Sequence, residues 1–375
     1  MLKLMCGFTA AAILAAVGGC EKREQQSSTE IRIGAVLLLT GNNALWGQNA
    51  KKAIDLLIDE ANAKGGINGR KVSIIYEDSQ GEAKTAVAAF QKLAEIDKVP
   101  AVLGDMLTST TLAMAPLANR AQIPLIGISC SAPAVTDAGP FVYRVWPSDL
   151  YEGKVCGEFA YSKGYRKAAI LFINNDYGNG LRGAFADAFQ KKGGIVAVEE
   201  AYMESSKEFR ASAAKIAAAA PDCVYIVGYY EDSAFAAKQL REGGFKGPLL
   251  GTSSSVHDKF VAIAGSAADG FVAAVVNDFD MAKLSVPQKN FVEAYKSRYG
   301  ENPDWAATHG GDAVSVILAC LRDKATDGPS IKSMIDARRD FDGINTTIHF
   351  DDNGDVVNKP IALKKVVNGA FTTLE

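Results

Sequence analysis

Short apolar stretches alternate with amphipathic ones along most of the chain. Residues 31–39 are apolar and β-branched, residues 44–63 place apolar side chains at helical spacing, and the glycine-rich run 65–69 ends that pattern. Similar pairs of strand and helix patterns recur as far as residue 251. Because the strand patterns have no polar face, they predict α/β units whose parallel sheets are covered by helices on both sides.

The alternation of strand and helix patterns ends in the last third of the chain. Two successive helices are expected around residues 287–299 and 305–321, and late strands at residues 348–350 and 362–367. No repeat of about 20–50 residues is present, which excludes solenoids and propellers. The chain thus contains two α/β units in series and a C-terminal segment that forms no third unit. This order predicts that the chain returns late to the first unit.

The N-terminal segment has a different pattern. A positively charged start precedes an apolar, alanine-rich stretch at residues 8–17, which has the length of the hydrophobic region of a signal peptide. It ends in Val17-Gly18-Gly19-Cys20, which resembles a bacterial lipobox. We therefore expect residues 1–19 to be a lipoprotein signal peptide, with residues 20–30 forming the acylated Cys20 and a flexible tether. An ordinary cleaved signal peptide with an incidental cysteine is the alternative.

Composition and charge narrow the function. A chain of 375 residues suits two domains, and a content of 48% hydrophobic and 22% charged residues is typical of a globular protein. A net charge of −3 gives no basic surface for nucleic acid. His257, His309 and His349 have no metal-ligand spacing, and no G-x-S-x-G nucleophile motif occurs, so we expect neither a metal, a cofactor nor a hydrolase site.

The cysteines beyond the export segment are widely spaced and contain no C-x-x-C pair. One disulfide in an oxidising envelope and buried free thiols are both compatible with this spacing. The residues concerned are Cys130, Cys156, Cys223 and Cys320.

Polar side chains follow the predicted strands of the first unit. In parallel α/β sheets, ligands bind beyond the carboxyl ends of the strands. Residues 104–111 contain four hydroxyl side chains at a helix start, and residues 129–132 contain two serines. Hydroxyl and backbone N–H groups at helix N-termini suit a carboxylate, although Ser and Thr also cap helices generally. Two such turns at one sheet edge favour an anion site over simple capping.

A glycine pattern in the second unit suggests a competing function. Residues 178–183 follow a predicted strand and match G-x-G-x-x-G, and acidic residues lie at 199–200, where an acid would bind a ribose. This arrangement is typical of a dinucleotide-dependent enzyme. Here several polar residues, Tyr177 among them, separate the strand from the first glycine, so we favour this alternative less. The three glycines are Gly178, Gly180 and Gly183.

Several of these segments carry a family resemblance. The chain resembles the periplasmic leucine/isoleucine/valine-binding proteins, which are type I solute-binding proteins of ABC transporters. The resemblance covers essentially the whole mature chain, and the run AKGGINGR at residues 63–70 is its most specific part. The other segments that carry it are residues 41–47, 76–78, 176–178 and 228–229.

The resemblance implies a set of ligand-binding positions. The first lobe would contribute a cleft-lining aromatic residue, a hydroxyl that binds the ligand carboxylate, and two serines near the ligand's amino end. The second lobe would contribute two tyrosines that complete the site on closure. These positions are Trp46, Thr108, Ser129, Ser131, Tyr177 and Tyr229.

One position departs from the family pattern. The amino-acid binders carry a Glu that pairs with the ligand's ammonium group, and Ser253 stands at the equivalent position here. Burying an ammonium without a countercharge costs several kcal/mol. Either another acid substitutes, or the ligand is a keto acid, an aromatic carboxylate or an amide. The candidate acids are Asp105, Asp176, Glu231 and Asp232.

Together these patterns predict an α/β protein with two doubly wound parallel-sheet lobes joined by a three-crossover hinge. We expect lobe 1 at residues 31–146 plus 278–350 and lobe 2 at residues 147–277 plus 351–375. The resemblance implies a solute-binding protein rather than an enzyme, and the motif at Cys20 adds a lipid anchor, so we expect a monomeric lipoprotein on the periplasmic side of the cell envelope. It would capture an amino acid or a related small carboxylate by cleft closure and deliver it to an ABC permease. A sensing protein that feeds a receptor would have the same fold and is the alternative.

Overall fold

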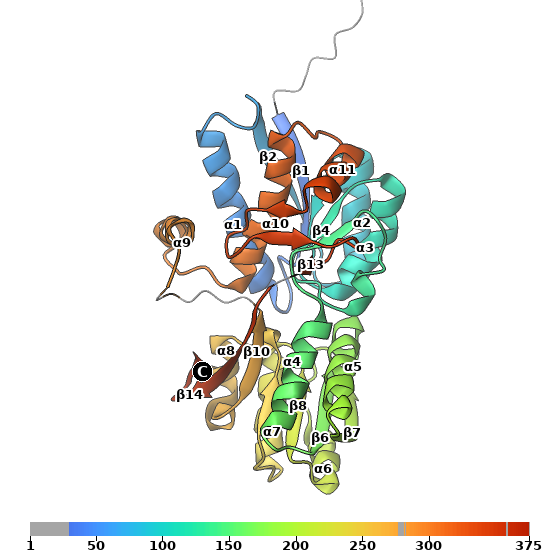
Figure 1. Cartoon of the computed structure of the whole chain (residues 1–375), viewed down its shortest axis with the longest axis vertical. Helices are drawn as coiled ribbons and strands as arrows, with labels where there is room; N and C mark the ends of the chain where they lie inside the picture. The colour runs from blue at the N-terminus through green and yellow to red at the C-terminus, as the bar shows by residue number, and fades with distance from the viewer. Residues whose placement is uncertain (1–29, 277–280, 282, 358, 375) are drawn as a thin grey trace, which may run out of the picture.

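Two lobes lie one above the other along the long axis of the molecule (Figure 1). The computed structural model describes residues 30–276, 281, 283–357 and 359–374. The predicted signal peptide and Cys20 therefore lie outside the described residues. Both lobes consist of a largely parallel sheet with helices packed against it, which confirms the predicted fold class.

Lobe 1 contains a five-stranded parallel sheet in the order β2-β1-β3-β4-β5. Its strands are β1 (Glu30–Leu37), β2 (Lys71–Asp78), β3 (Val102–Leu103), β4 (Leu125–Gly127) and β5 (Val142–Arg144). Its helices are α1 (Ala44–Ala63), α2 (Ala83–Gln91), α3 (Thr108–Ala121), α9 (Val286–Tyr299), α10 (Trp305–Arg322) and α11 (Gly328–Arg338). A small antiparallel sheet adds β11 (Asp340–Phe341), β12 (Ile348–Phe350) and β13 (Val356–Val357).

The central strand β1 is apolar on both faces because each face is covered. Ile33 and Leu37 belong to a core cluster that includes Ile54 of α1 and Ile317 of α10. Val36, on the opposite face, packs in a separate cluster with residues of α2 and α3. Burial on both faces is the arrangement that its continuous apolar sequence predicted.

Lobe 2 contains a seven-stranded sheet in the order β15-β14-β10-β9-β8-β6-β7. Five strands are parallel, whereas β14 and β15 run antiparallel at one edge. The strands are β6 (Lys167–Ile173), β7 (Ile195–Tyr202), β8 (Cys223–Val227), β9 (Leu249–Gly251), β10 (Val272–Val276), β14 (Ile361–Val367) and β15 (Ala370–Thr373). The helices are α4 (Asp149–Ser162), α5 (Asp176–Lys191), α6 (Arg210–Ala219), α7 (Tyr230–Glu242) and α8 (Asp258–Ala264).

The chain passes between the lobes three times, after β5, β10 and β13. Two buried ion pairs lie beside these passages. Arg144, at the end of β5, donates from Nε and Nη2 to the two carboxylate oxygens of Asp355 at 2.7 and 2.6 Å. Lys359, which follows β13, contacts Asp312 of α10 at 2.8 Å. Since β13 still pairs with β12, the third passage begins after Val357, a few residues beyond the expected division at residue 350.

The described cysteines are all buried and unpaired. Of the two alternatives for these residues, the structure therefore shows buried free thiols. In a search of the described residues, no helix proved both long and apolar enough to cross a membrane.

Candidate functional site

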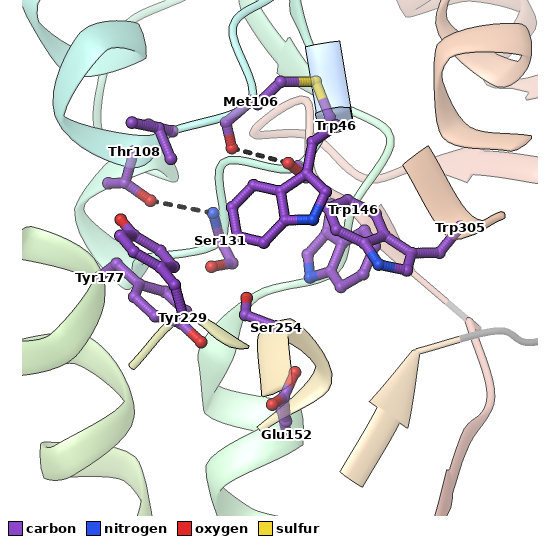
Figure 2. Close-up of a pocket in the computed structure, with 12 residues that line it drawn as sticks. Trp46, Met106, Thr108, Ser131, Trp146, Glu152, Tyr177, Tyr229, Ser254 and Trp305 are labelled. Carbon is purple, nitrogen blue, oxygen red and sulfur yellow. Dashed lines mark hydrogen bonds between the residues drawn. The ribbon is translucent and has the colours of Figure 1, made fainter. Parts of the chain in front are cut away.

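A small cavity lies between the lobes, with a volume of about 20 Å³ (Figure 2). This is room for roughly one water molecule. The six ligand-binding positions that the resemblance implied all line it, whereas Ser253, the further residue expected at the site, does not. The lining residues are Trp46, Met106, Leu107, Thr108, Ser129, Ser131, Trp146, Glu152, Tyr177, Tyr229, Ser254 and Trp305.

Thr108 begins α3 and lies 3% exposed at the cavity wall. Its Oγ1 accepts hydrogen bonds from the backbone N–H groups of Ser131 at 3.1 Å and Ala132 at 3.3 Å. Because the oxygen acts as the acceptor in both bonds, the hydroxyl proton is available to a ligand acceptor. Thr110 and Thr111 instead donate to the carbonyl oxygen of Leu107, so only one of the threonines in this turn faces the cavity.

The two serines after β4 are held in place by hydrogen bonds to neighbouring backbone and side-chain groups. Ser129 Oγ donates to the Met106 carbonyl oxygen at 2.6 Å. The Ser131 carbonyl oxygen accepts from the Asp149 N–H at 2.8 Å and from Arg144 Nη1 at 2.9 Å. Arg144 thus joins the ligand-facing loop of lobe 1 to the hinge.

Two tyrosines form the wall on the side of lobe 2. The rings of Tyr177 and Tyr229 stack with their centroids 5.5 Å apart and an interplanar angle of 10°. Tyr177 lies in the first turn of α5, which the Asn175 side chain caps, and its hydroxyl donates to Thr252 Oγ1 at 2.9 Å. Burial raises the pKa of both phenols well above the ordinary value, so they remain neutral.

All three tryptophans of the chain lie at this cavity. Trp46 comes from α1, Trp146 from the first passage between the lobes, and Trp305 from the start of α10. The ring centroids of Trp46 and Trp305 are 5.3 Å apart, and those of Trp146 and Trp305 are 5.2 Å apart. The buried Trp46 Nε1 has no hydrogen-bond partner among the described residues, so it is a second donor available to a ligand.

The acid at the cavity is Glu152, which sequence reasoning missed. It lies on α4, 3% exposed, on the lobe 2 side of the cavity and opposite Trp46 and Thr108 (Figure 2). Burial raises its pKa to about 7, and two hydrogen bonds from Ser253 counteract part of this rise. A carboxylate with this pKa is close to half ionised at neutral pH.

Ser253, which was also expected at the site, does not line this cavity but lies behind it and holds Glu152. Its backbone N–H donates to Glu152 Oε1 at 2.8 Å, and its Oγ donates to Oε2 at 2.8 Å. Ser254, the next residue in the same short turn, reaches the cavity instead. Ser253, which the resemblance places at the acidic position, is therefore in direct contact with Glu152.

None of the four acids suggested by the sequence lines this cavity. Asp105 is buried and accepts a hydrogen bond from the Met106 N–H. Asp176 is exposed at the start of α5, and Glu231 forms an ion pair with Lys207. The Asp232 carboxylate is buried and accepts from the Tyr202 hydroxyl at 2.9 Å.

A second buried acid, Asp149, lies one helical turn before Glu152. Neither of its carboxylate oxygens has a hydrogen-bond partner among the described residues. Burial, together with the nearby Glu152 carboxylate, raises the pKa of Asp149 well above its ordinary value. Burial thus disfavours the charged form of Asp149, and among the described residues that line the cavity the acid is Glu152.

The glycine pattern that suggested a dinucleotide site has a packing role. A Cβ at Gly178 would lie 1.8 Å from the Ile173 carbonyl oxygen, and one at Gly180 would lie 2.8 Å from Pro133 of lobe 1. These glycines allow α5 to approach β6 and lobe 1 closely. Gly183 has open space around it. The first two glycines therefore have a structural explanation that needs no nucleotide.

The arrangement suits binding of a small polar molecule from both sides. Lobe 1 presents the donors Thr108 and Trp46, lobe 2 presents the acceptor Glu152, and aromatic rings separate them. His309 is buried against Trp146, and burial lowers its pKa to about 4, so it is neutral. No three His, Cys, Asp or Glu side chains in the described part of the chain are grouped to hold a metal ion.

Comparison with known proteins agrees with this geometry. A family model described as periplasmic binding protein matches residues 30–370. An amino acid binding protein from Pseudomonas aeruginosa is 26% identical over 304 residues, which cover 80% of each chain.

Solved structures give the same result. The leucine-binding protein LivK from Thermotoga maritima superposes with a TM-score of 0.83 at 27% identity, covering 92% of this chain and 98% of that one. A solute-binding protein of an ABC transporter from Rhodopseudomonas palustris, in complex with 3,4-dihydroxybenzoic acid, has a TM-score of 0.80 at 25% identity over 92% and 95% of the two chains. The chain belongs to the periplasmic binding protein family, and it has the type I fold of the leucine/isoleucine/valine-binding proteins.

Proposed function

We propose that this protein captures an amino acid or a related small carboxylate between its lobes and delivers it to an ABC permease. Its family consists of extracytoplasmic solute-binding proteins rather than enzymes. We therefore do not retain the alternative of a dinucleotide-dependent enzyme. Relatives named for binding leucine, isoleucine, valine, threonine and alanine support the amino-acid class. A structural neighbour was solved in complex with a dihydroxybenzoic acid, so aromatic carboxylates are also candidate ligands.

The observation that carries the proposal is the free hydroxyl proton of Thr108 at a cavity formed by both lobes. This hydroxyl already accepts two backbone N–H bonds, so a ligand oxygen is the partner that its proton needs. A cavity of about 20 Å³ is too small for such a ligand, so the lobes must open to admit it. Ligand contacts from both lobes then favour the closed state over the open one.

A thermal-shift screen of the protein without its N-terminal segment, starting at Glu30, tests the proposal. The panel contains the standard amino acids, their 2-oxo acid counterparts and aromatic carboxylates. A ligand at about 1,000 times its Kd adds roughly 4 kcal/mol of stability, which is a shift of several degrees in Tm. No shift with any compound of these classes contradicts the proposed ligand class.

We further propose that Cys20 carries the lipid that holds the protein at the membrane. The support is the Val17-Gly18-Gly19-Cys20 motif and the polar segment that follows it. Full-length protein should take up a labelled fatty acid in cells and fractionate with membranes, whereas Cys20→Ser should do neither. Equal labelling of both proteins contradicts the anchor and leaves solute binding unaffected.

A further inference from the structure

The charged side chains at the cavity indicate which further charge a carboxylate ligand should carry. Among the described residues that line it, Glu152 is the only acid, and no Lys, Arg or His is present. A ligand with a carboxylate and no cation would enter beside an acid without any basic side chain to offset the repulsion. A ligand that also carries a cationic nitrogen would neutralise Glu152 on binding.

Glu152 retains the capacity to bind such a nitrogen. Each carboxylate oxygen accepts one hydrogen bond from Ser253, both at 2.8 Å. A carboxylate has about four acceptor sites, so lone pairs remain on both oxygens. Because Ser253 donates from its backbone and its side chain, it fixes the orientation of the carboxylate before the ligand arrives.

The donors on lobe 1 define the other end of the ligand. The Trp46 indole N–H has no acceptor among the described residues, and the Thr108 oxygen accepts two backbone N–H bonds, which leaves its proton for a ligand; both residues line the cavity. Donors from lobe 1 and an acceptor from lobe 2 match a molecule with a carboxylate and an ammonium group. The faces of Tyr177 and Tyr229 between them also attract a cation.

We infer that Glu152 pairs with the ammonium group of the ligand, and that the solute is therefore an α-amino acid rather than its deaminated counterpart. The inference rests on the proposed function and identifies the ligand class of the same site. The countercharge reaches the cavity from helix α4, and Ser253, at the expected acidic position, holds it there. Glu152 is thus a specificity-determining residue.

A purely structural role for Glu152 makes a different prediction. In that case Glu152 only braces the turn that contains Ser253 and Ser254, and its replacement disturbs every ligand to the same extent. Pairing with the ammonium instead makes the effect depend on whether the ligand carries that group. The amino acid and 2-oxo acid with the same side chain are therefore the appropriate probes.

The experiment is calorimetric titration of wild-type protein, Glu152→Gln and the control Glu158→Gln at about pH 8, where Glu152 is mostly ionised. Glu158 lies on the same helix but on the surface, paired with Lys192, so its substitution is chemically matched. The ligands are the standard amino acids and the 2-oxo acid counterpart of the tightest binder. Circular dichroism establishes that each variant is folded.

We expect the wild-type protein to bind the amino acid at least about 100-fold more tightly than the 2-oxo acid. Glu152→Gln should weaken binding of the amino acid by about tenfold or more and change binding of the 2-oxo acid by less than about threefold. Glu158→Gln should behave like the wild type. If Glu152→Gln does not fold, the wild-type ratio alone decides the question.

Three outcomes overturn the inference. Equal weakening of both ligands by Glu152→Gln assigns this residue a structural role. Tighter wild-type binding of 2-oxo acids or aromatic carboxylates overturns the inference and leaves the proposed function intact. Binding of none of these compounds overturns both.

Discussion

At the scale of single residues, Thr108 links the structure of lobe 1 to its ligand chemistry. Its oxygen satisfies two backbone N–H groups of the loop after β4, and its proton faces the cavity. A residue with both roles contributes to stability and to affinity, and the two contributions can be separated. The methyl group of Thr108 is not needed for either hydrogen-bonding role.

Replacement of Thr108 by Val removes the hydroxyl and keeps the shape. We expect ligand affinity to fall by about 1–3 kcal/mol and Tm to fall as well, because the N–H groups of Ser131 and Ala132 lose their acceptor. Thr108→Ser retains the hydroxyl and should retain most of the affinity. Titration calorimetry and thermal denaturation measure the two effects, and wild-type affinity in Thr108→Val contradicts the assigned role.

Glu152 should make the stability of the protein depend on pH. Burial raises its pKa from 4.5 to about 7, so the folded protein binds this proton more tightly than the unfolded chain does. Its favourable contribution is complete below the unfolded pKa and is lost as the pH rises through about 7. Asp149, also buried and with a raised pKa, acts in the same direction.

We therefore expect the ligand-free protein to lose about 1–3 kcal/mol of stability between roughly pH 5 and pH 8 through Glu152. Glu152→Gln should show a smaller loss, since only Asp149 and the remaining groups still titrate. Urea denaturation of both proteins at the two pH values gives the difference. Identical pH dependence of the two proteins would show that Glu152 does not titrate as stated.

At the scale of elements, helix α4 carries the acid and also provides the packing that positions it. Glu152 lines the cavity, while Gly153 and Gly157 face α5. A Cβ on Gly153 would lie 2.5 Å from Ala184 Cβ, and one on Gly157 would lie 2.8 Å from the Phe185 carbonyl oxygen. The close approach of the two helices therefore depends on these glycines, and the position of Glu152 depends on that approach.

Substitution of Gly157 by Ala should destabilise the protein by about 1–2 kcal/mol, because contact with the α5 backbone outweighs the gain in helix propensity. Gly183→Ala on α5 is the matched control. A Cβ on Gly183 would meet no neighbouring atom within 4 Å, so the substitution should stabilise by about 0.5–1 kcal/mol. Urea denaturation compares them, and effects of the same sign would contradict the packing argument.

Much of the site was predictable at this scale because strand ends mark ligand positions in parallel sheets. That rule led to the turns that contain Thr108, Ser129 and Ser131, and the family resemblance added Trp46, Tyr177 and Tyr229. It could not lead to Glu152, which lies within a helix one turn from its start. The available signal was an acid followed by glycines at positions 153 and 157, on a helix that packs closely against α5.

At the scale of the whole molecule, buried ion pairs lie beside two of the passages between the lobes, those after β5 and β13. The Arg144 guanidinium is fully buried and forms two hydrogen bonds with the Asp355 carboxylate. The same guanidinium donates to the Ser131 carbonyl oxygen beside the cavity. Chain segments about 210 residues apart in sequence are thus joined at the hinge by a single pair.

Removing the charge of Asp355 should therefore be costly. Asp355→Asn leaves Arg144 buried with a weaker partner, and we expect a loss of about 3–5 kcal/mol of stability. The control is Asp187→Asn, which removes an exposed pair with Lys191 and should cost no more than about 0.5 kcal/mol. Equal shifts in the urea midpoints of the two variants would contradict the importance of the hinge pair.

The two-lobed architecture and the late return of the chain to lobe 1 followed from the alternation of apolar and amphipathic segments. The position of Trp305 did not, because it depends on how α10 packs against α1. Nor could the sequence predict the antiparallel edge formed by β14 and β15, since each strand can pair in either direction at the edge of a sheet. Such features depend on contacts between distant segments rather than on local pattern.

The meeting of all three tryptophans at one cavity has a practical consequence. Tryptophan dominates the intrinsic fluorescence of a protein, and no other tryptophan exists elsewhere in this chain to dilute the signal. Entry of a solute and movement of the lobes would change the surroundings of every indole at once. The emission spectrum of the unlabelled protein should therefore report occupancy directly, making the molecule its own optical sensor for the solute it carries.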